Sequence, residues 1–330
     1  MESLSIQKRP KLKNPCLVVA WPGMGEVAFK AAQYLIEQLN ATEFASLAPD
    51  EFFYLTGSLV QDGILSLPEL PYGKFYFWKN PENKPSNKKN ARDLIIFLSN
   101  AQPDLARAEK YCQLILTLAK DYNVKTVVSM ASMPQAIDHT QDPAVWFTGT
   151  SKEVNDSFKG YQMNLLSQGQ ISGMNGLFLG MAKVKGFAGL CILGEIPLYT
   201  LQIENPKAAF VVLEALTRIL GIKLDFGPLV DQAHLMEGEI NKLLDYLKAG
   251  AAGQPSPIGE EEIEKIKKSL SQLTRLPVSV KEKIDKLFVQ SQTDLSKANE
   301  LKAELDKWNV YKEYEDRFLD LFKKSKEKDN

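Results

Sequence analysis

The sequence has 330 residues, of which 44% are hydrophobic, and its formal net charge is -1. This length predicts about two domains, and the near-neutral charge argues against a general nucleic-acid-binding protein, which would carry a basic face. No apolar run approaches the roughly 18 residues that a membrane-spanning helix needs, so we expect a cytoplasmic protein that binds neither membrane nor nucleic acid.

The first half of the chain predicts the start of an α/β domain. Residues 1–14 are polar and basic, and we expect them to be flexible. Residues 15–250 alternate strand and helix patterns, which predicts one core domain. The domain begins with a buried strand over 16–21, a break at Pro22-Gly-Met-Gly25, and a helix over 26–39. Further strands are expected at 42–47, 52–55, 74–78 and 93–98, with an exposed loop at 80–90.

The second half of this domain repeats the alternation. Asp104 can cap a helix over 104–120, and Pro206 and Gly221 suit the two ends of a helix over 206–220. Other expected helices are 175–182 and 229–247, and other expected strands are 126–130, 144–148 and 188–193. The pattern predicts an α/β fold with a mixed, largely parallel sheet flanked by helices, plus a C-terminal α-helical arm.

The composition changes after residue 250. Residues 251–258 are small residues and proline, which predicts a linker, and residues 259–330 predict a helical hairpin or coiled-coil-like arm. In the arm, Leu287, Leu301, Leu305 and Trp308 fall on an apolar stripe with nearly heptad spacing. We expect these four residues to contact a partner or a second copy. A helical cap that packs on its own domain is an equally open interpretation.

Two loops are candidate ligand sites. Gly23 and Gly25 precede Ala28 in a Gly-x-Gly-x-x-Ala pattern between a strand and a helix, which is the context of a dinucleotide loop. The acidic residue that would hold a ribose is not convincingly placed, so a tight structural turn is the favoured interpretation and a ligand loop the alternative.

The second loop contains Gly173, Asn175 and Gly176 and comes directly before a predicted helix. Glu195 follows a predicted apolar strand, and carboxylates at the carboxyl ends of strands are plausible site residues in α/β folds. Any ligand is therefore expected near these residues. A carboxylate that accepts hydrogen bonds from backbone amides is the structural alternative for Glu195.

Catalytic groups are sparse. The three cysteines, Cys16, Cys112 and Cys191, lie far apart within apolar runs, which predicts buried free thiols and no metal site. Ser129 and Ser132 follow a strand and precede His139, but no Gly-x-Ser-x-Gly elbow is present, so a structural role of these serines is favoured. We predict no catalytic residue and no cofactor, and lean against an enzyme.

An ordered set of segments resembles the proteasome-assembly-chaperone-2 family over residues 15–250. The set comprises Trp21-Pro-Gly-Met-Gly25, residues 124–130, Ile171-Ser-Gly-Met-Asn-Gly-Leu177, Leu193-Gly-Glu195, Asn205-Pro-Lys-Ala-Ala209, Leu220-Gly-Ile222 and Asp225. The resemblance implies a phosphorylase-like fold with a mixed, partly barrel-like sheet. It also implies homo-oligomers, often trimers, and a role like that of eukaryotic members, which are chaperones that assemble the proteasome α-ring.

Two functions remain open. The first is a non-catalytic, oligomeric binding protein with a chaperone-like or scaffolding role in assembling a proteasome-like or other protein complex. The alternative is an enzyme or sensor that binds a nucleoside, a nucleotide or phosphate in the phosphorylase-like cleft.

Overall fold

The computed structural model describes residues 3–55, 57–61, 63–82, 92–251, 278–294, 297–307 and 311–326. The chain forms two compact units, Met1–Leu273 and Thr274–Asn330. Among the described residues, every helix is too short or too polar to span a bilayer.

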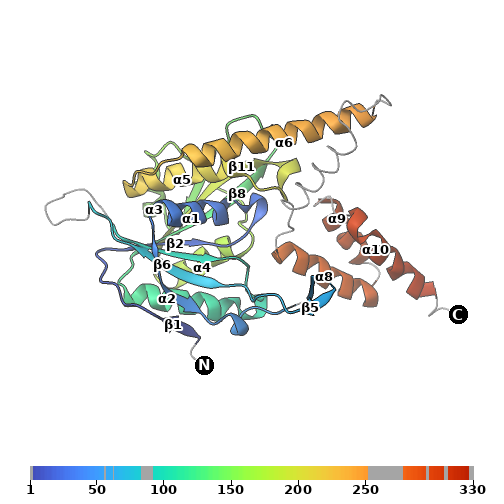
Figure 1. Ribbon diagram of the computed structural model, residues 1–330, viewed down its shortest axis with the longest axis horizontal. Coiled ribbons are helices and arrows are strands. Elements are labelled where there is room, and N and C mark those ends of the chain that lie inside the picture. Colours follow the sequence, from blue (N-terminus) through green and yellow to red (C-terminus); the bar gives the residue numbers. More distant parts are fainter. Residues whose placement is uncertain are drawn as a thin grey trace. The chain divides into compact units, whose positions relative to one another are not determined.

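A nine-stranded sheet runs through the first unit (Figure 1) in the order β1-β3-β6-β7-β2-β8-β11-β9-β10. Its strands are β1 (Leu4–Ile6), β2 (Cys16–Ala20), β3 (Thr42–Leu47), β6 (Gly73–Trp78), β7 (Leu94–Ser99), β8 (Thr126–Gln135), β9 (Val145–Gly149), β10 (Asn164–Leu165) and β11 (Ala188–Pro197). A separate hairpin joins β4 (Leu59–Gln61) to β5 (Ile64–Ser66).

The centre of the sheet is parallel and both flanks contain antiparallel pairs. Strands β7, β2, β8 and β11 run in one direction, whereas β6 and β9 run against their inner neighbours. All five residues of β2 are buried, as expected for a strand covered on both faces. The carboxyl ends of the four parallel strands therefore meet at one edge of the sheet.

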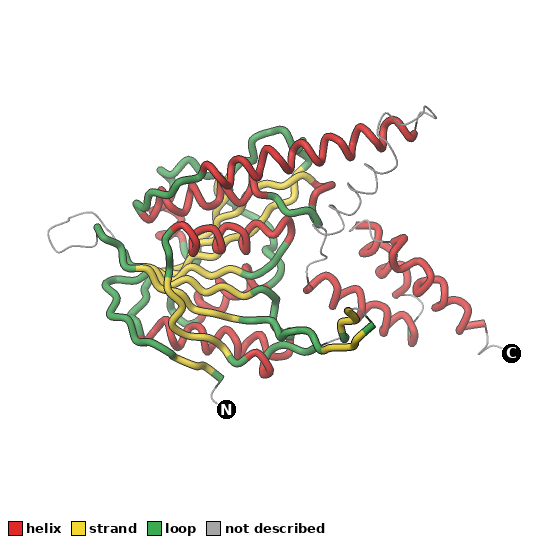
Figure 2. The backbone as a smooth tube through the Cα atoms, in the orientation of Figure 1, coloured by secondary structure: helices red, strands yellow, loops and turns green. Residues whose placement is uncertain are grey.

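Helices cover both faces of the sheet (Figure 2). One face carries α1 (Val27–Gln38), α5 (Pro206–Leu220) and α6 (Gly227–Ala251), and the other carries α2 (Ala108–Asp121) and α4 (Met174–Val184). A short helix, α3 (Lys152–Phe158), follows β9. The predicted fold class, a mixed α/β sheet flanked by helices, is thus confirmed.

Local sequence signals explain why both ends of α5 could be predicted. Asn205 caps α5 by accepting a hydrogen bond from the amide of Ala208 at 2.9 Å, and Pro206 occupies the first turn. Gly221 ends the helix in a left-handed conformation with φ 65°.

Two expectations for the first half were incomplete or wrong. Residues 1–14 were expected to be flexible, but Leu4–Ile6 form strand β1, because Leu4 and Ile6 pack on the core beside β3. Residues 52–55 do not form the predicted strand. Phe52 and Phe53 follow a 3-10 turn and are both buried against Tyr111, with ring centroids at 4.9 and 6.0 Å. Strand alternation would send consecutive side chains to opposite faces.

The second unit contains three described helices, α8 (Val278–Thr293), α9 (Lys297–Lys307) and α10 (Tyr311–Lys326). Phe288 stacks on Tyr314 with ring centroids 5.8 Å apart, and Arg317 lies 4.1 Å above the Phe288 ring while pairing with Asp285 at 2.6 Å. The helix predicted at 259–273 and most of the predicted linker lie outside the described residues, so the domain boundaries stay a prediction.

Candidate functional site

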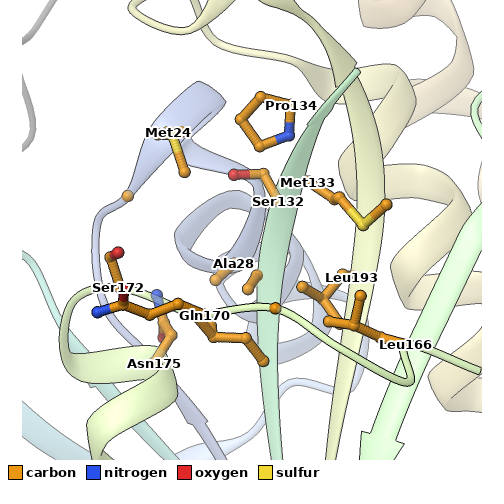
Figure 3. Close-up of a pocket in the computed structure, with 14 residues that line it drawn as sticks. Met24, Ala28, Ser132, Met133, Pro134, Leu166, Gln170, Ser172, Asn175 and Leu193 are labelled. Carbon is orange, nitrogen blue, oxygen red and sulfur yellow. The ribbon is translucent and has the colours of Figure 1, made fainter.

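A pocket of about 230 Å³ opens at the carboxyl edge of the parallel strands (Figure 3). It lies between the turn after β2, the end of β8 and the loop that leads into α4. From this edge β2 continues into α1 on one face of the sheet, whereas α4 covers the opposite face. Crevices at such switch points are the usual ligand sites of open α/β sheets. The lining residues are Gly23, Met24, Ala28, Ala131, Ser132, Met133, Pro134, Leu166, Gly169, Gln170, Ile171, Ser172, Asn175 and Leu193.

The lining contains no charged side chain among the described residues. Met24, Ser132 and Ser172 lie around one side of the pocket, and Leu166 and Leu193 lie on the other (Figure 3). The hydroxyls of the two serines have no hydrogen-bond partner within the described parts of the chain. The pocket therefore suits an uncharged, largely apolar group that makes one or two hydrogen bonds.

Asn175 joins two segments that are 154 residues apart in the sequence. Its Oδ1 accepts a hydrogen bond from the backbone N–H of Trp21 at 3.1 Å, and its Nδ2 donates to the Trp21 carbonyl at 3.0 Å. Because both amide atoms are engaged and the side chain is buried, Asn175 acts as a clamp on the pocket wall. Asn175 therefore affects a ligand indirectly, because it fixes the position of the turn after β2.

Gln102 makes a second clamp beside it. Its Nε2 donates to the carbonyl of Pro22 at 2.8 Å, and its Oε1 accepts from the amide of Met174 at 3.1 Å. Buried polar groups are nearly always satisfied in this way, because an unpaired one costs about 1–3 kcal/mol. The two amide side chains hold the end of β2 against the start of α4.

The glycines of the second loop have steric roles. A Cβ at Gly176 would lie 2.1 Å from the carbonyl oxygen of Ile171, so the loop passes too close to α4 for any side chain. Gly173 adopts φ 75°, which side-chain-bearing residues rarely adopt, and a Cβ there would meet Gln102. Neither glycine lines the pocket.

The turn of Gly23 and Gly25 is largely occupied by its own backbone. The amide of Gly25 donates to the carbonyl of Leu201 at 2.9 Å, and the amide of Glu26 donates to the carbonyl of Gly23 at 3.0 Å. Asn205 donates its backbone N–H to the Gly25 carbonyl at 2.8 Å. A phosphate loop needs free amides that point at the ligand, so these contacts favour the structural-turn interpretation. Gly23 does line the pocket.

Glu195 is placed away from the lining. Its carboxylate accepts hydrogen bonds from the amide of Ala144 at 3.0 Å and from the indole Nε1 of Trp146 at 2.8 Å. This arrangement matches the structural alternative for the residue, in which neighbouring N–H groups satisfy the carboxylate. Of the six predicted ligand residues, the structure brings Gly23 and Asn175 together at the pocket.

The serine and histidine residues do not form a catalytic pair. Both ring nitrogens of the buried His139 are engaged, Nδ1 with the Tyr199 hydroxyl at 2.8 Å and Nε2 with Asn241 Oδ1 at 2.9 Å. Ser129 is buried within β8, and Ser132 lies at the pocket. His139 therefore ties the loop after β8 to α6.

The thiols offer no activated nucleophile either. Cys16, Cys112 and Cys191 are free and buried, and burial raises the pKa of the Cys16 thiol to about 11 and that of Cys191 to about 12. Within the described ranges, no group of three His, Cys, Asp or Glu side chains could hold a metal ion.

Several pocket residues were not predicted from the sequence, among them Met24, Met133, Leu166 and Leu193. Their apolar character is typical of core residues, so no single position stands out. The available signal was topological, since the residues after β2 and β8 had to meet once those strands were adjacent and parallel.

Three of the four predicted partner contacts of the arm are buried. Leu287 is 5% exposed, and Leu301 and Leu305 are fully buried. Trp308 lies outside the described residues. The partner contact of these residues stays a prediction. Leu287 lies on α8 and Leu301 and Leu305 lie on α9, and these two helices pack against each other.

A family model and individual relatives both match most of the chain. The model of the PAC2 family matches residues 17–244. The uncharacterized protein MJ1210 of Methanocaldococcus jannaschii is 28% identical over 262 residues, which cover 77% of this chain and 93% of MJ1210.

Two solved structures from Pyrococcus furiosus extend the comparison. PbaB, described as an archaeal proteasome activator, is 26% identical with a TM-score of 0.62, and the match covers 73% of this chain and 97% of PbaB. PbaA, described as an archaeal homolog of proteasome-assembly chaperone, shares the fold at 23% identity and a TM-score of 0.54, over 75% of this chain and 98% of PbaA.

Proposed function

This chain belongs to the PAC2 family, and on that premise we propose that it is a chaperone-like binding protein of a proteasome-related assembly. The observation that carries the proposal is the similarity to PbaB, which extends over nearly the whole of that protein. Fold alone does not define function, so the partner class is taken from PbaB and must be tested directly on this chain.

The chemistry of the described residues supports binding over catalysis. The pocket is lined by apolar, hydroxyl and amide side chains, His139 is engaged on both ring nitrogens, and the thiols are buried. The alternative function, binding of a nucleotide or phosphate, would need cationic side chains or free loop amides. The pocket's volume of about 230 Å³ also lies below the range of about 300–1,000 Å³ that is typical of ligand sites.

Self-association is part of the proposal. We infer a cytoplasmic homo-oligomer, with a trimer as the expected form, in which the α/β unit supplies the body of each copy. The helical unit would then carry contacts to the assembly through its exposed apolar side chains, which include Val289 and Leu319 at 62% and 44% exposure.

The test is native purification of the tagged full-length chain from its own cells, with the bound proteins identified by mass spectrometry. Proteasome subunits are expected at a fixed ratio to the chain. A full-length variant with Val289→Asp and Leu319→Asp should lose these subunits, while Asn299→Ala, an exposed position in α9, should keep them. Recovery of the chain alone, in repeated purifications under mild conditions, would reject the proteasome-related partner.

A further inference from the structure

The pocket at the carboxyl edge of the sheet has one polar side and one apolar side (Figure 3). Ser132 and Ser172 lie on the side of Met24, whereas Leu166 and Leu193 form the opposite wall. Neither serine hydroxyl has a hydrogen-bond partner within the described parts of the chain. A molecule in this pocket would therefore meet hydrocarbon at one end and, at the other, two hydroxyls that can each donate or accept a hydrogen bond.

The walls of the pocket are held in place by the protein itself. Asn175 and Gln102 join the end of β2 to the start of α4 through buried hydrogen bonds of 2.8 to 3.1 Å. A preformed site loses little conformational freedom when it binds a ligand, and this favours affinity for small molecules. The pocket is thus suited to binding without rearrangement of the sheet.

The volume and the charge of the pocket limit the class of ligand. A cavity of about 150 Å³ accepts benzene, so a pocket of about 230 Å³ has room for a molecule of about eight non-hydrogen atoms. Among the described residues that line it, none carries a charge. Because burial of an unpaired charge is costly, the ligand that fits is small and neutral.

Two methionines favour an aromatic ring in this ligand. Met24 and Met133 both line the pocket, and a thioether sulfur makes favourable contacts with an aromatic ring at a distance of about 5 Å. The leucines of the apolar wall cover the same ring without any polar requirement.

We propose that this pocket binds a free, neutral molecule with one aromatic ring and one hydroxyl or amide group. The ring lies against Leu166 and Leu193, and the polar group bonds the hydroxyls of Ser132 and Ser172. This site adds a small-molecule ligand to the proposed binding of protein partners, and it does not depend on which protein the chain binds.

The experiment titrates the purified full-length chain, labelled with ¹³C at its methionine methyl groups, with benzyl alcohol as the probe. A bound ring shifts the NMR signals of the methyl groups beside it, so the Met24 and Met133 signals should move along one common saturable curve. Met236 in α6 does not line the pocket, and its signal should stay in place. For a ligand of this size we expect a Kd of about 10 μM to 1 mM. Replacement of each methionine by leucine in turn assigns the signals.

Charged molecules of similar size test the neutral character of the site. Benzoate and protonated benzylamine should bind at least about 10-fold more weakly than benzyl alcohol, because the pocket offers no opposite charge. Ser132→Ala and Ser172→Ala should each weaken benzyl alcohol by about 2- to 10-fold, the usual effect of one lost hydrogen bond. Equal affinity for benzoate, or an unchanged Kd in the double variant, would overturn the assigned ligand class.

Pocket-filling variants test the location. Ser172→Trp and Ser132→Phe should abolish the shifts, whereas Ser167→Trp should keep the wild-type Kd, because Ser167 is an exposed serine of the same loop that does not line the pocket. An unchanged Met236 signal shows that a variant is folded. Shifts that persist in both folded pocket-filling variants, or no shift in the wild-type chain up to about 10 mM benzyl alcohol, would overturn the inference. Neither result affects the proposed function, which purification from cells tests separately.

Discussion

The α/β unit and the helical unit use apolar sequence patterns in different ways. In the helical unit, the described leucines of the stripe that suggested a docking arm, Leu287, Leu301 and Leu305, are buried. In the α/β unit, the hairpin at residues 59–66 was not predicted from the sequence, and its large apolar side chains are exposed. An apolar stripe therefore predicts that its side chains need to be buried, but the segment that covers them is determined by the tertiary structure.

The two units also differ in how their cores are built. The α/β unit buries side chains on both faces of one sheet, so its strands and helices support one another across long sequence separations. The helical unit relies on a few side chains from three helices, and small cores give marginal stability. Substitutions of similar size should therefore have more severe consequences in the helical unit.

The largest expected effect comes from Leu301→Ala. Truncation of a buried leucine costs about 2–5 kcal/mol because it removes apolar contacts and leaves a cavity, which is a large part of what a unit of this size can supply. Hydrogen exchange read by mass spectrometry should show loss of protection in α8–α10 and unchanged protection in β2 and β7. Asn299→Ala, exposed in the same helix, is the control.

Loss of protection in both units would contradict their independent stability, because it would mean that the units unfold as one cooperative body. Unchanged protection in α8–α10 would mean that Leu301 contributes little to the core of the helical unit.

Gly176→Ala tests the α/β unit at the pocket wall. The new Cβ would lie 2.1 Å from the Ile171 carbonyl oxygen, so the loop or α4 must shift, and overpacking of this kind costs about 1–3 kcal/mol. Gly180→Ala is the matched control in the same helix, since nothing lies within 4 Å of its added Cβ, and it should stabilise by about 0.5–1 kcal/mol. Urea unfolding measures both. Equal effects of the two substitutions would contradict the steric role of Gly176.

Elements with strong local signals could be predicted from the sequence. Strand β3 was placed at Thr42–Leu47 and helix α5 at Pro206–Leu220, as the structure has them. The wrong strand at residues 52–55 has a clear cause, since aromatic residues favour strands while Phe52 and Phe53 follow a turn set by Pro49. Strand β1 was missed because its three residues gain their order from pairing with β3.

The site was only partly predictable, for a similar reason. Asn175 was predicted as a ligand residue and does line the pocket, but its bonds to Trp21 span 154 residues and have no local signature. Glu195 was expected to face a ligand, and its bonds to Ala144 and Trp146 depend on the antiparallel placement of β9 beside β11. Spacing identifies which loops meet, but the hydrogen-bond partner of each side chain depends on the whole fold.

The smallest of these effects is expected at Ser291 in the helical unit. Ser291 interrupts the apolar stripe, and its hydroxyl is buried without a hydrogen-bond partner in the described part of the chain. Ser291→Ala removes an unsatisfied polar group and improves helix propensity, so it should stabilise the helical unit by about 1 kcal/mol. Ser157→Ala in α3 is the control, because that exposed hydroxyl already donates to the Val154 carbonyl at 2.7 Å, and its effect should stay within about 0.5 kcal/mol. Hydrogen exchange of α8 measures the change in stability for Ser291→Ala. A loss of protection in α8 would mean that the Ser291 hydroxyl makes a stabilising hydrogen bond, so that the core of the helical unit depends on a polar contact.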